Sequence, residues 1–394
     1  MGKYRHPTAL LAALLWSGNA LSGLAGEITQ EYRYYPHTGL YETKAQHDRA
    51  TVLRPEYSQS WDQDRMVFVF SPYLRAGTNE EARDHADVRE FSFTRAWNHY
   101  EIKLGISKVF WGVTESTHLV DVINQTDLAG NPDGEDKLGQ PLLQTSVFSD
   151  LGNFEFYVLP YFRERTFTGE NGRLRGALAV DPDEAIYLHA DKARHRDYAL
   201  RWSHSWQDVE WALSWFKGTD RDPGFRRQEN GNKLTAVYGQ SRQWSLEAQW
   251  LNGGWLLKSE LLRKNSDLTG EYVASVSGLE YTFANLAGGM DLGLLYEWLY
   301  DNRNDEMPSK LDNASFTGAR LALNDVDSTE FLLGAVINNA DGNLALLRLE
   351  ASGRLTENIS WTLEYLGILL PPESSSYEQM KQDDYGQFAL SYHW

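Results

Sequence analysis

The feature that most constrains the fold is an alternation of apolar and polar side chains with a period of two, repeated in segments of about ten residues. Successive side chains of an extended strand point to opposite faces, so this period predicts strands with one apolar and one polar face. The alternation is clearest in residues 99–106, 208–217, 290–300 and 358–365. A soluble β-sandwich gives the same alternation, but the number of segments, their length and their aromatic ends favour a membrane barrel.

The whole chain divides into about 18 such strands. They are predicted at 28–34, 50–61, 65–75, 87–97, 99–110, 143–150, 153–163, 196–206, 208–217, 243–252, 255–264, 271–283, 290–301, 315–324, 328–338, 343–354, 358–369 and 384–394. The fold class expected is therefore an all-β, transmembrane antiparallel barrel, with a single barrel domain at 26–394. Barrels of about 16 to 18 strands leave an aqueous lumen.

The lengths of the connections support this count, because outer-membrane barrels alternate short periplasmic turns with longer outer loops. With the N-terminus in the periplasm, the long connections at 111–142, 164–195, 218–242, 302–314 and 370–383 all fall outside. The short ones around Asn98, Gln207 and Gly253 fall inside. This parity requires that 232–241 is a loop. If that segment is a strand, or if 28–34 and 143–150 are not strands, the count becomes 16 or 20.

The N-terminus has the pattern of a secretory signal peptide. Lys3 and Arg5 precede an apolar run over 9–16, and Gly23-Leu24-Ala25 has the small-x-small spacing of a cleavage site. We expect residues 1–25 to be removed and the protein to reach the outer membrane of a Gram-negative cell. The apolar run is too short for a membrane-spanning helix, which needs about 20 apolar residues.

The other end of the chain carries a second export cue. Phe388, Leu390, Tyr392 and Trp394 alternate up to a C-terminal aromatic residue. This resembles the terminal strand signal recognised by the outer-membrane assembly machinery. Outer-membrane lipid and that machinery are therefore predicted partners.

Charge and composition exclude several classes of function. The formal net charge is −18, which argues against nucleic acid as a partner because phosphate binding needs a basic surface. The absence of cysteine excludes disulfides, thiolate metal sites and cysteine nucleophiles. No spacing of histidines or acids indicates a metal site, and no motif indicates a cofactor. Aromatic residues make up 13% of the chain, which fits the aromatic girdles of a membrane barrel.

The most unusual stretch is 108–128, which follows a clear strand and precedes a Gly- and Asp-rich segment. It contains Phe110-Trp111-Gly112, Glu115-Ser116 and the run 121–127, Asp-Val-Ile-Asn-Gln-Thr-Asp. These residues resemble an uncharacterised family of proteobacterial outer-membrane barrels with a porin-like design. The resemblance extends to Leu256-Leu257-Lys258-Ser259-Glu260, Glu280-Tyr281-Thr282-Phe283 and Leu294-Leu295-Tyr296-Glu297. It implies the architecture of the chain and does not define a substrate.

In large barrels a long loop between early strands folds inward and narrows the lumen, and 111–142 is the candidate here by analogy. The expected constriction has Glu115, Asp121 and Asp127 as its acids, with Asn124 beside them and Trp111 as a wall. The alternative is an outer loop packed on the rim, and the sequence does not choose between the two.

Charged residues on the predicted inner faces indicate the selectivity of the lumen. The acids exceed the bases, which favours cations as rings of Asp and Glu do in cation pores. The residues are Glu101, Glu210, Glu247, Glu260, Glu297 and Glu364, with Lys103 and Lys258. The alternative is that these acids pair with Arg201, Arg263 or Arg348 and fill the interior as a salt-bridge network.

The function predicted is a porin-like channel for passive or selective diffusion of small solutes, with cations preferred. The alternative is a barrel plugged by its own loops that binds or transports a hydrophobic or polymeric ligand. An enzyme is not expected. The nearest match to a barrel hydrolase is Ser203-His204-Ser205, and there His204 shares its face with Trp202 and Trp206. Oligomeric state is not readable from the sequence.

Overall fold

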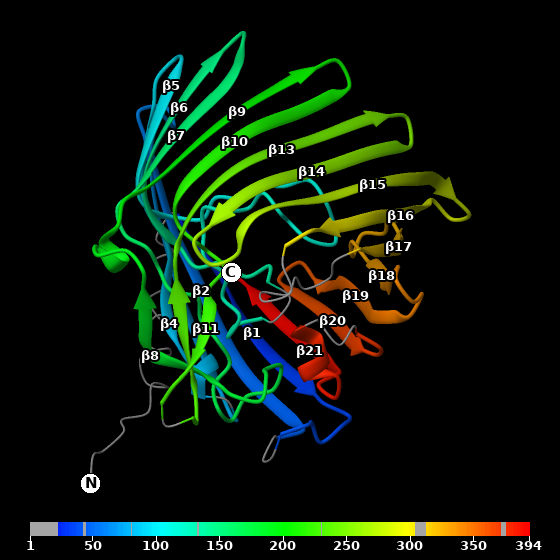
Figure 1. Ribbon diagram of the computed structural model, residues 1–394. Coiled ribbons are helices and arrows are strands. Elements are labelled where there is room, and N and C mark those ends of the chain that lie inside the picture. Colours follow the sequence, from blue (N-terminus) through cyan, green and yellow to red (C-terminus); the bar gives the residue numbers. More distant parts are fainter. Residues whose placement is uncertain are drawn as a thin grey trace.

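Eighteen strands form one closed antiparallel barrel (Figure 1). The computed structural model describes residues 23–41, 45–79, 81–131, 134–229, 231–303, 313–371 and 376–394. Most of the predicted signal peptide lies outside these residues, so its cleavage stays a prediction. Closure is direct, because β1 pairs with β2 on one side and with β21 on the other. The predicted fold class is therefore confirmed.

The barrel strands agree with the predicted segments, with shifts of a few residues at their ends. They are β1 (Leu24–Tyr34), β2 (His47–Trp61), β3 (Met66–Gly77), β4 (Ala86–Ala96), β5 (Tyr100–Ser107), β6 (Gln140–Ser149), β7 (Gly152–Leu159), β9 (Asp197–Trp206), β10 (Val209–Thr219), β13 (Gln240–Asn252), β14 (Trp255–Ser266), β15 (Gly270–Leu286), β16 (Met290–Asp301), β17 (Ala314–Ala322), β18 (Glu330–Asn338), β19 (Leu344–Thr356), β20 (Ile359–Ile368) and β21 (Tyr385–His393). Three short 3₁₀ helices lie in loops: η1 (Glu81–Arg83), η2 (Lys192–Arg194) and η3 (Ser376–Met380).

Short turns and long loops separate to opposite ends of the barrel. The turns at one end have two to seven residues, as in the β9–β10 hairpin (Figure 1). The other end carries 108–139, 160–196 and 220–239, the longest connections between barrel strands. The parity inferred from the sequence is therefore confirmed. It follows from antiparallel pairing around the whole ring, because each reversal places consecutive connections at opposite ends.

One strand was missed within the segment interpreted as a loop at 232–241. Leu234–Tyr238 forms β12, which pairs with β11 (Gly224–Arg227) and runs parallel to β8 (Val180–Tyr187). These three strands make a separate small sheet among the long loops. The prediction of a loop was wrong locally, yet the barrel count is unaffected because β12 does not pair with any barrel strand.

The outward face of the barrel is an apolar band with aromatic residues at both ends. In β16, Leu294, Tyr296 and Trp298 are exposed, whereas Leu295, Glu297 and Leu299 between them are buried. Exposed aromatics near the short turns are Trp61, Trp97, Tyr100, Trp206, Trp255 and Phe283. Those near the long-loop end are Tyr32, Tyr34, Tyr198, Trp244, Trp298 and Tyr300. No helix in the described part of the chain is long and apolar enough to cross a membrane.

Candidate functional site

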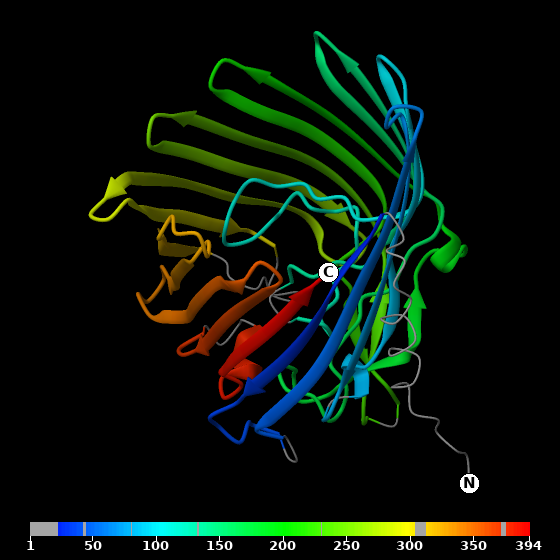
Figure 2. The same ribbon diagram turned by 180° about the vertical axis from the view of Figure 1, so that it is seen from behind.

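The inward loop, residues 108–139, leaves the end of β5 and folds into the barrel (Figure 2). Its apolar residues Trp111, Val120 and Ile123 pack with Leu142 of β6, Tyr157 of β7 and other wall residues in one buried cluster. The loop also bonds Glu260 and Glu297, which lie on the inner faces of β14 and β16, a position that a loop packed only on the rim would not reach. The structure therefore decides the question that the sequence left open, and the loop lies inside the lumen.

A buried glutamate on β14 anchors the first part of the inward loop. Glu260 is 0% exposed. Its Oε1 accepts hydrogen bonds from the backbone of Val113 (2.7 Å) and from the backbone and hydroxyl of Thr114 (3.1 and 2.8 Å). Its Oε2 accepts a bond from the backbone of Val120 at 3.2 Å. A carboxylate is suited to this task because it accepts on both oxygens and donates nothing.

A second glutamate on β16 anchors the residues that follow. Glu297, also 0% exposed, accepts hydrogen bonds from the backbone of Glu115 (2.7 Å) and from the backbone and hydroxyl of Ser116 (2.8 and 2.6 Å). Lys258 on β14 lies 3.5 Å from Glu297 and 3.8 Å from Glu280 on β15. The segments that carry the family resemblance therefore meet in the structure. The strand segments of that resemblance supply Lys258, Glu260, Glu280 and Glu297, and two of these residues, Glu260 and Glu297, bond directly to the loop segment 108–128.

The far part of the inward loop is fixed to the opposite stretch of wall by an aspartate. Asp127 pairs with Arg89 of β4, and Thr166 donates to it at 2.5 Å. His85 lies 3.3 Å from the same carboxylate. Burial alone would raise the pKa of Asp127, but His85 and the Arg89 charge outweigh it and hold this pKa well below its ordinary value. The carboxylate is therefore charged at neutral pH.

Two further polar residues hold the base of the inward loop together. Asn124 accepts a hydrogen bond from the backbone of Val109 and donates to the carbonyls of Ser107 and Leu138. Asp121 pairs with Lys137 at 3.2 Å, although burial raises the pKa of this carboxyl. These contacts join the outgoing and returning legs of the loop.

The structure corrects the expected makeup of the constriction. Trp111 is only 2% exposed and lies inside the packing between loop and wall, so it is not a wall of the passage. Asp121, Asn124 and Asp127 are likewise buried among their partners and hold the loop in place. Of the expected set, Glu115 alone keeps partial contact with solvent; it pairs with Arg320 of β17 at 2.8 Å. Any effect of the four buried residues on a solute is therefore indirect.

The charged residues expected on the inner faces of the strands do lie there in the strand register. These are Glu101, Lys103, Glu210, Glu247, Lys258, Glu260, Glu297 and Glu364. Several of them are neutralised, as the salt-bridge alternative supposed: Arg201 of β9 pairs with Glu247 and lies 3.3 Å from Glu155. Arg263 is on the outward face, where it pairs with Glu271. The role of these residues in conduction stays a prediction.

The inward loop divides the lumen into two sides. On the packed side, from β4 to β16, it covers the wall, and residues such as Gln243, Ser245 and Glu247 are buried beneath it. On the open side, formed by β17 to β21 with β1 to β3, Arg54, Arg320, Arg348 and Glu350 stay partly exposed. Other charged side chains there are buried, among them Arg33 and Arg75.

The edge of the inward loop that faces the open side carries residues that the sequence reasoning missed. Phe110 is 59% exposed, in contrast to its buried neighbour Trp111. Glu135 is 45% exposed and lies within electrostatic reach of Arg348, while Asp136 lies within reach of Arg54. Acids on the loop edge thus face arginines on the wall. The alternation in β17 places Arg320 inward, and this is the signal by which the sequence identifies it. Arg348 of β19 is already identified from the sequence as a possible partner of the luminal acids.

A second long connection crosses the long-loop end of the barrel. We call residues 160–179 the roof segment; it runs from β7 to the ends of β1 and β21. Arg173 bonds Asp383 at 2.6 Å and stacks on Tyr35, and Leu174 packs in the cluster of Tyr35, Ile368 and Tyr385. The roof segment also contacts the inward loop through Thr166.

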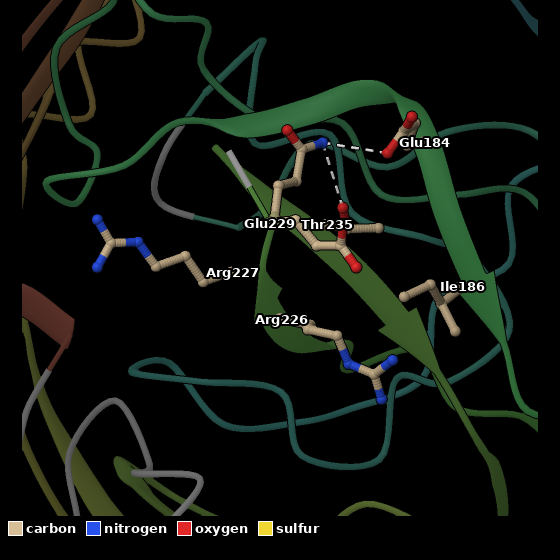
Figure 3. Close-up of a pocket in the computed structure, with 7 residues that line it drawn as sticks. Glu184, Ile186, Arg226, Arg227, Glu229 and Thr235 are labelled. Carbon is tan, nitrogen blue, oxygen red and sulfur yellow. Dashed lines mark hydrogen bonds between the residues drawn. The ribbon is translucent and has the colours of Figure 1, made fainter. Parts of the chain in front are cut away.

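The small sheet carries an open depression of about 490 Å³ (Figure 3). Gln228 of the β11–β12 turn donates to Glu184 of β8 at 3.1 Å and to Thr235 of β12 at 3.3 Å. Arg226, Arg227 and Glu229 complete the lining with Ile186. The charges are mixed, and the polar groups that meet there already bond one another, so the depression does not have the character of a binding site.

No hydrolase site forms around His204. Trp202 and Trp206 are exposed on the outward face with it, and its ring lies 6.2 Å from Trp211. Ser203 and Ser205 point to the other face, as the alternation predicts. Within the residues that the structure describes, no group of three or more histidines and acids is placed to hold a metal ion.

Comparisons with known proteins were made at the level of families, sequences and solved structures. No family model matches the chain, and no curated protein matches it. Among solved structures, a substituted form of the Rh. blastica porin is 11% identical, with 94% of this chain and 99% of that chain covered and a TM-score of 0.46. OmpT, an in-vitro folded outer membrane protein of Vibrio cholerae in its trimer form, is 10% identical, with 94% and 98% covered and a TM-score of 0.47. The fold assignment rests on the strand pairing of this chain itself.

Proposed function

We propose that this protein is an outer-membrane channel through which small solutes diffuse, with a modest preference for cations. The observation that carries the proposal is the division of the lumen. A closed ring of 18 strands is wide enough for water, and the inward loop fills one side while partly exposed charges line the other. The apolar outer band with its two aromatic girdles suits a bilayer.

The cation preference is supported by the loop edge. Glu115, Glu135 and Asp136 lie on the loop, and the wall facing them carries Arg54, Arg320 and Arg348. Two of these arginines are already paired with wall acids, since Arg348 pairs with Glu350 and Arg54 pairs with Glu27 at 2.5 Å, whereas Arg320 pairs with Glu115 of the loop at 2.8 Å. Glu135 and Asp136 therefore shift the balance toward negative charge, and the excess of acids in the whole chain acts in the same direction.

Planar-bilayer recording tests the channel proposal. Folded protein purified in detergent is added to a bilayer, and conductance is recorded at two salt concentrations with reversal potentials under a salt gradient. We expect discrete steps and a reversal potential on the cation side. Heat-unfolded protein from the same preparation is the control. Absence of steps from a verified folded barrel would contradict the proposal.

A second function is favoured by the roof segment: a loop-plugged barrel that opens for a specific ligand. Arg173, Asp383 and Tyr35 tie this segment across the outer mouth. If the roof closes the channel, the wild-type barrel is silent and Arg173→Ala conducts. If the roof leaves the open side free, both proteins conduct from the start.

Assembly and location are part of the same proposal. β21 closes the barrel against β1, with Phe388, Leu390 and Tyr392 exposed on the outward face. This placement supports the proposed role of the terminal strand as an assembly signal. Replacing Trp394 and Tyr392 by Ala is expected to lower the amount of folded barrel in outer-membrane fractions, measured by heat-modifiable gel mobility.

A further inference from the structure

One histidine stands where the two legs of the inward loop and the barrel wall meet. His118 Nε2 lies 3.3 Å from the Glu135 carboxylate on the returning leg. Its ring meets Phe110 edge-on, with centroids 4.8 Å apart. Its Nδ1 is buried and has no hydrogen-bond partner in the described structure; it lies 4.0 Å from Glu260 Oε1.

The charges around this ring are mostly negative. Glu135 and Asp121 face it from the loop, and Glu260 faces it from β14. The positive groups nearby act on these carboxylates. Lys137 pairs with Asp121, and the charge of Arg348 acts on Glu135. Burial opposes a charge on the ring, but the surrounding carboxylates outweigh it, so the pKa of His118 is raised above its ordinary value of about 6.5.

We propose that His118 tunes the charge selectivity of the channel: protonated, it adds a positive charge beside Glu135 at the loop edge, and neutral, it removes that charge. The inference rests on the proposed channel function. The proton is exchanged with water in the lumen, and no other bond changes. The direction follows from charge: loss of one positive charge at the edge attracts cations and repels anions.

The size of the effect follows from Coulomb's law in a water-filled lumen. A unit charge within about 8 Å of a passing ion acts through high dielectric and salt, so each ion feels a few tenths of a kcal/mol at most. When the positive charge is lost, the energy of a passing cation falls by that amount and the energy of a passing anion rises by it. We expect the cation-to-anion permeability ratio to rise about twofold to threefold as the pH rises through the pKa of His118.

The test is the reversal potential of the wild-type channel from pH 5 to pH 9 at moderate salt, beside three variants. His118→Asn removes the titrating group, keeps a polar side chain and should hold the ratio at its high value at every pH. Glu135→Gln removes the partner of His118. The change in permeability ratio with pH should then have a lower midpoint and a smaller amplitude. His189→Asn changes an exposed histidine in the outer loop and should keep the wild-type step.

Each result decides something different. A step that persists unchanged in His118→Asn, or a wild-type ratio that does not depend on pH, overturns the assignment of His118 while the channel proposal stands. A folded barrel that never conducts overturns the channel proposal and this inference with it. Independently of conduction, an NMR titration of histidine-labelled barrel in detergent must show a His118 pKa above about 6.5, and a lower value overturns the inference.

Discussion

The two sides of the lumen are built from the same kind of strand, yet they differ in what covers their polar residues. On the packed side, Glu260 and Glu297 are surrounded by loop backbone and accept its N–H groups. On the open side, Arg320 and Arg348 keep more than a third of their side-chain surface exposed. The comparison shows that one loop buries the polar residues of one part of the wall and leaves those of the other part partly exposed. A carboxylate beneath the loop anchors loop backbone, whereas an uncovered charged group keeps its contact with water.

The largest expected effect comes from removing the inward loop. Replacing residues 112–136 by a short Gly/Ser linker abolishes the difference between the sides and uncovers the buried acids. Single-channel conductance is expected to rise severalfold, because the water-filled cross-section of an 18-stranded barrel is then unobstructed. Heat-modifiable gel mobility checks that the barrel still folds. An unchanged conductance in a folded barrel would mean that the loop does not limit the path.

The next largest effect is expected from changing a glutamate that holds the inward loop to the wall. In Glu260→Gln the side chain loses its charge and one of its two accepting oxygens, while four hydrogen bonds need acceptors. We expect a loss of at least about 2 kcal/mol of unfolding free energy, since hydrogen bonds to charged groups contribute more than neutral ones. Noisier channel currents should accompany it. Denaturant unfolding in detergent gives the measurement, and Glu364→Gln on the open side is the matched control, expected to change stability little.

A smaller effect separates the arginines of the two sides. Arg348→Ala removes a positive charge from the open side and is expected to raise the cation-to-anion permeability ratio about twofold. Arg201→Ala removes one from the packed side, where Glu247 and Glu155 surround it, and should lower stability more than it changes selectivity. Reversal potentials and unfolding curves on both variants give the comparison. The reverse ranking in selectivity would place the ion path on the other side.

The smallest expected effect is the pH dependence of the stability that Asp127 contributes. Asp127 has a folded pKa well below its unfolded value near 3.9, so it stabilises the loop above that pH and loses this contribution as the pH falls toward the folded pKa. Asp127→Asn should therefore destabilise the barrel by about 2 kcal/mol at pH 7, and by less below about pH 4. Unfolding midpoints at pH 7 and pH 3 measure the difference. Equal destabilisation at both would show that the charge of Asp127 does not matter.

The sequence by itself determined the barrel, because side-chain alternation is local information. All 18 barrel strands, the parity of their connections and the inward direction of Glu297 or Glu364 follow from a period of two. β12 was missed because a five-residue strand in a loop sheet has no face toward the barrel wall to reveal it. Its pairing with β8 is set by contacts more than forty residues apart in the chain.

Only the tertiary structure decided where the inward loop goes and what its residues do. The sequence predicts that Trp111 is a wall of the constriction and that Asp121 and Asp127 are two of its acids. A loop has no periodicity that shows which of its side chains are covered, so the sequence could not reveal their burial. Their burial depends on Leu142, Arg89 and Lys137, which are distant from them in the sequence and meet them only in the folded structure. The exposed edge at Phe110, His118 and Glu135 is what remains once that packing is complete. The local sequence pattern determines the strands. Whether a polar residue on a strand is buried depends on how the loop packs inside the folded barrel.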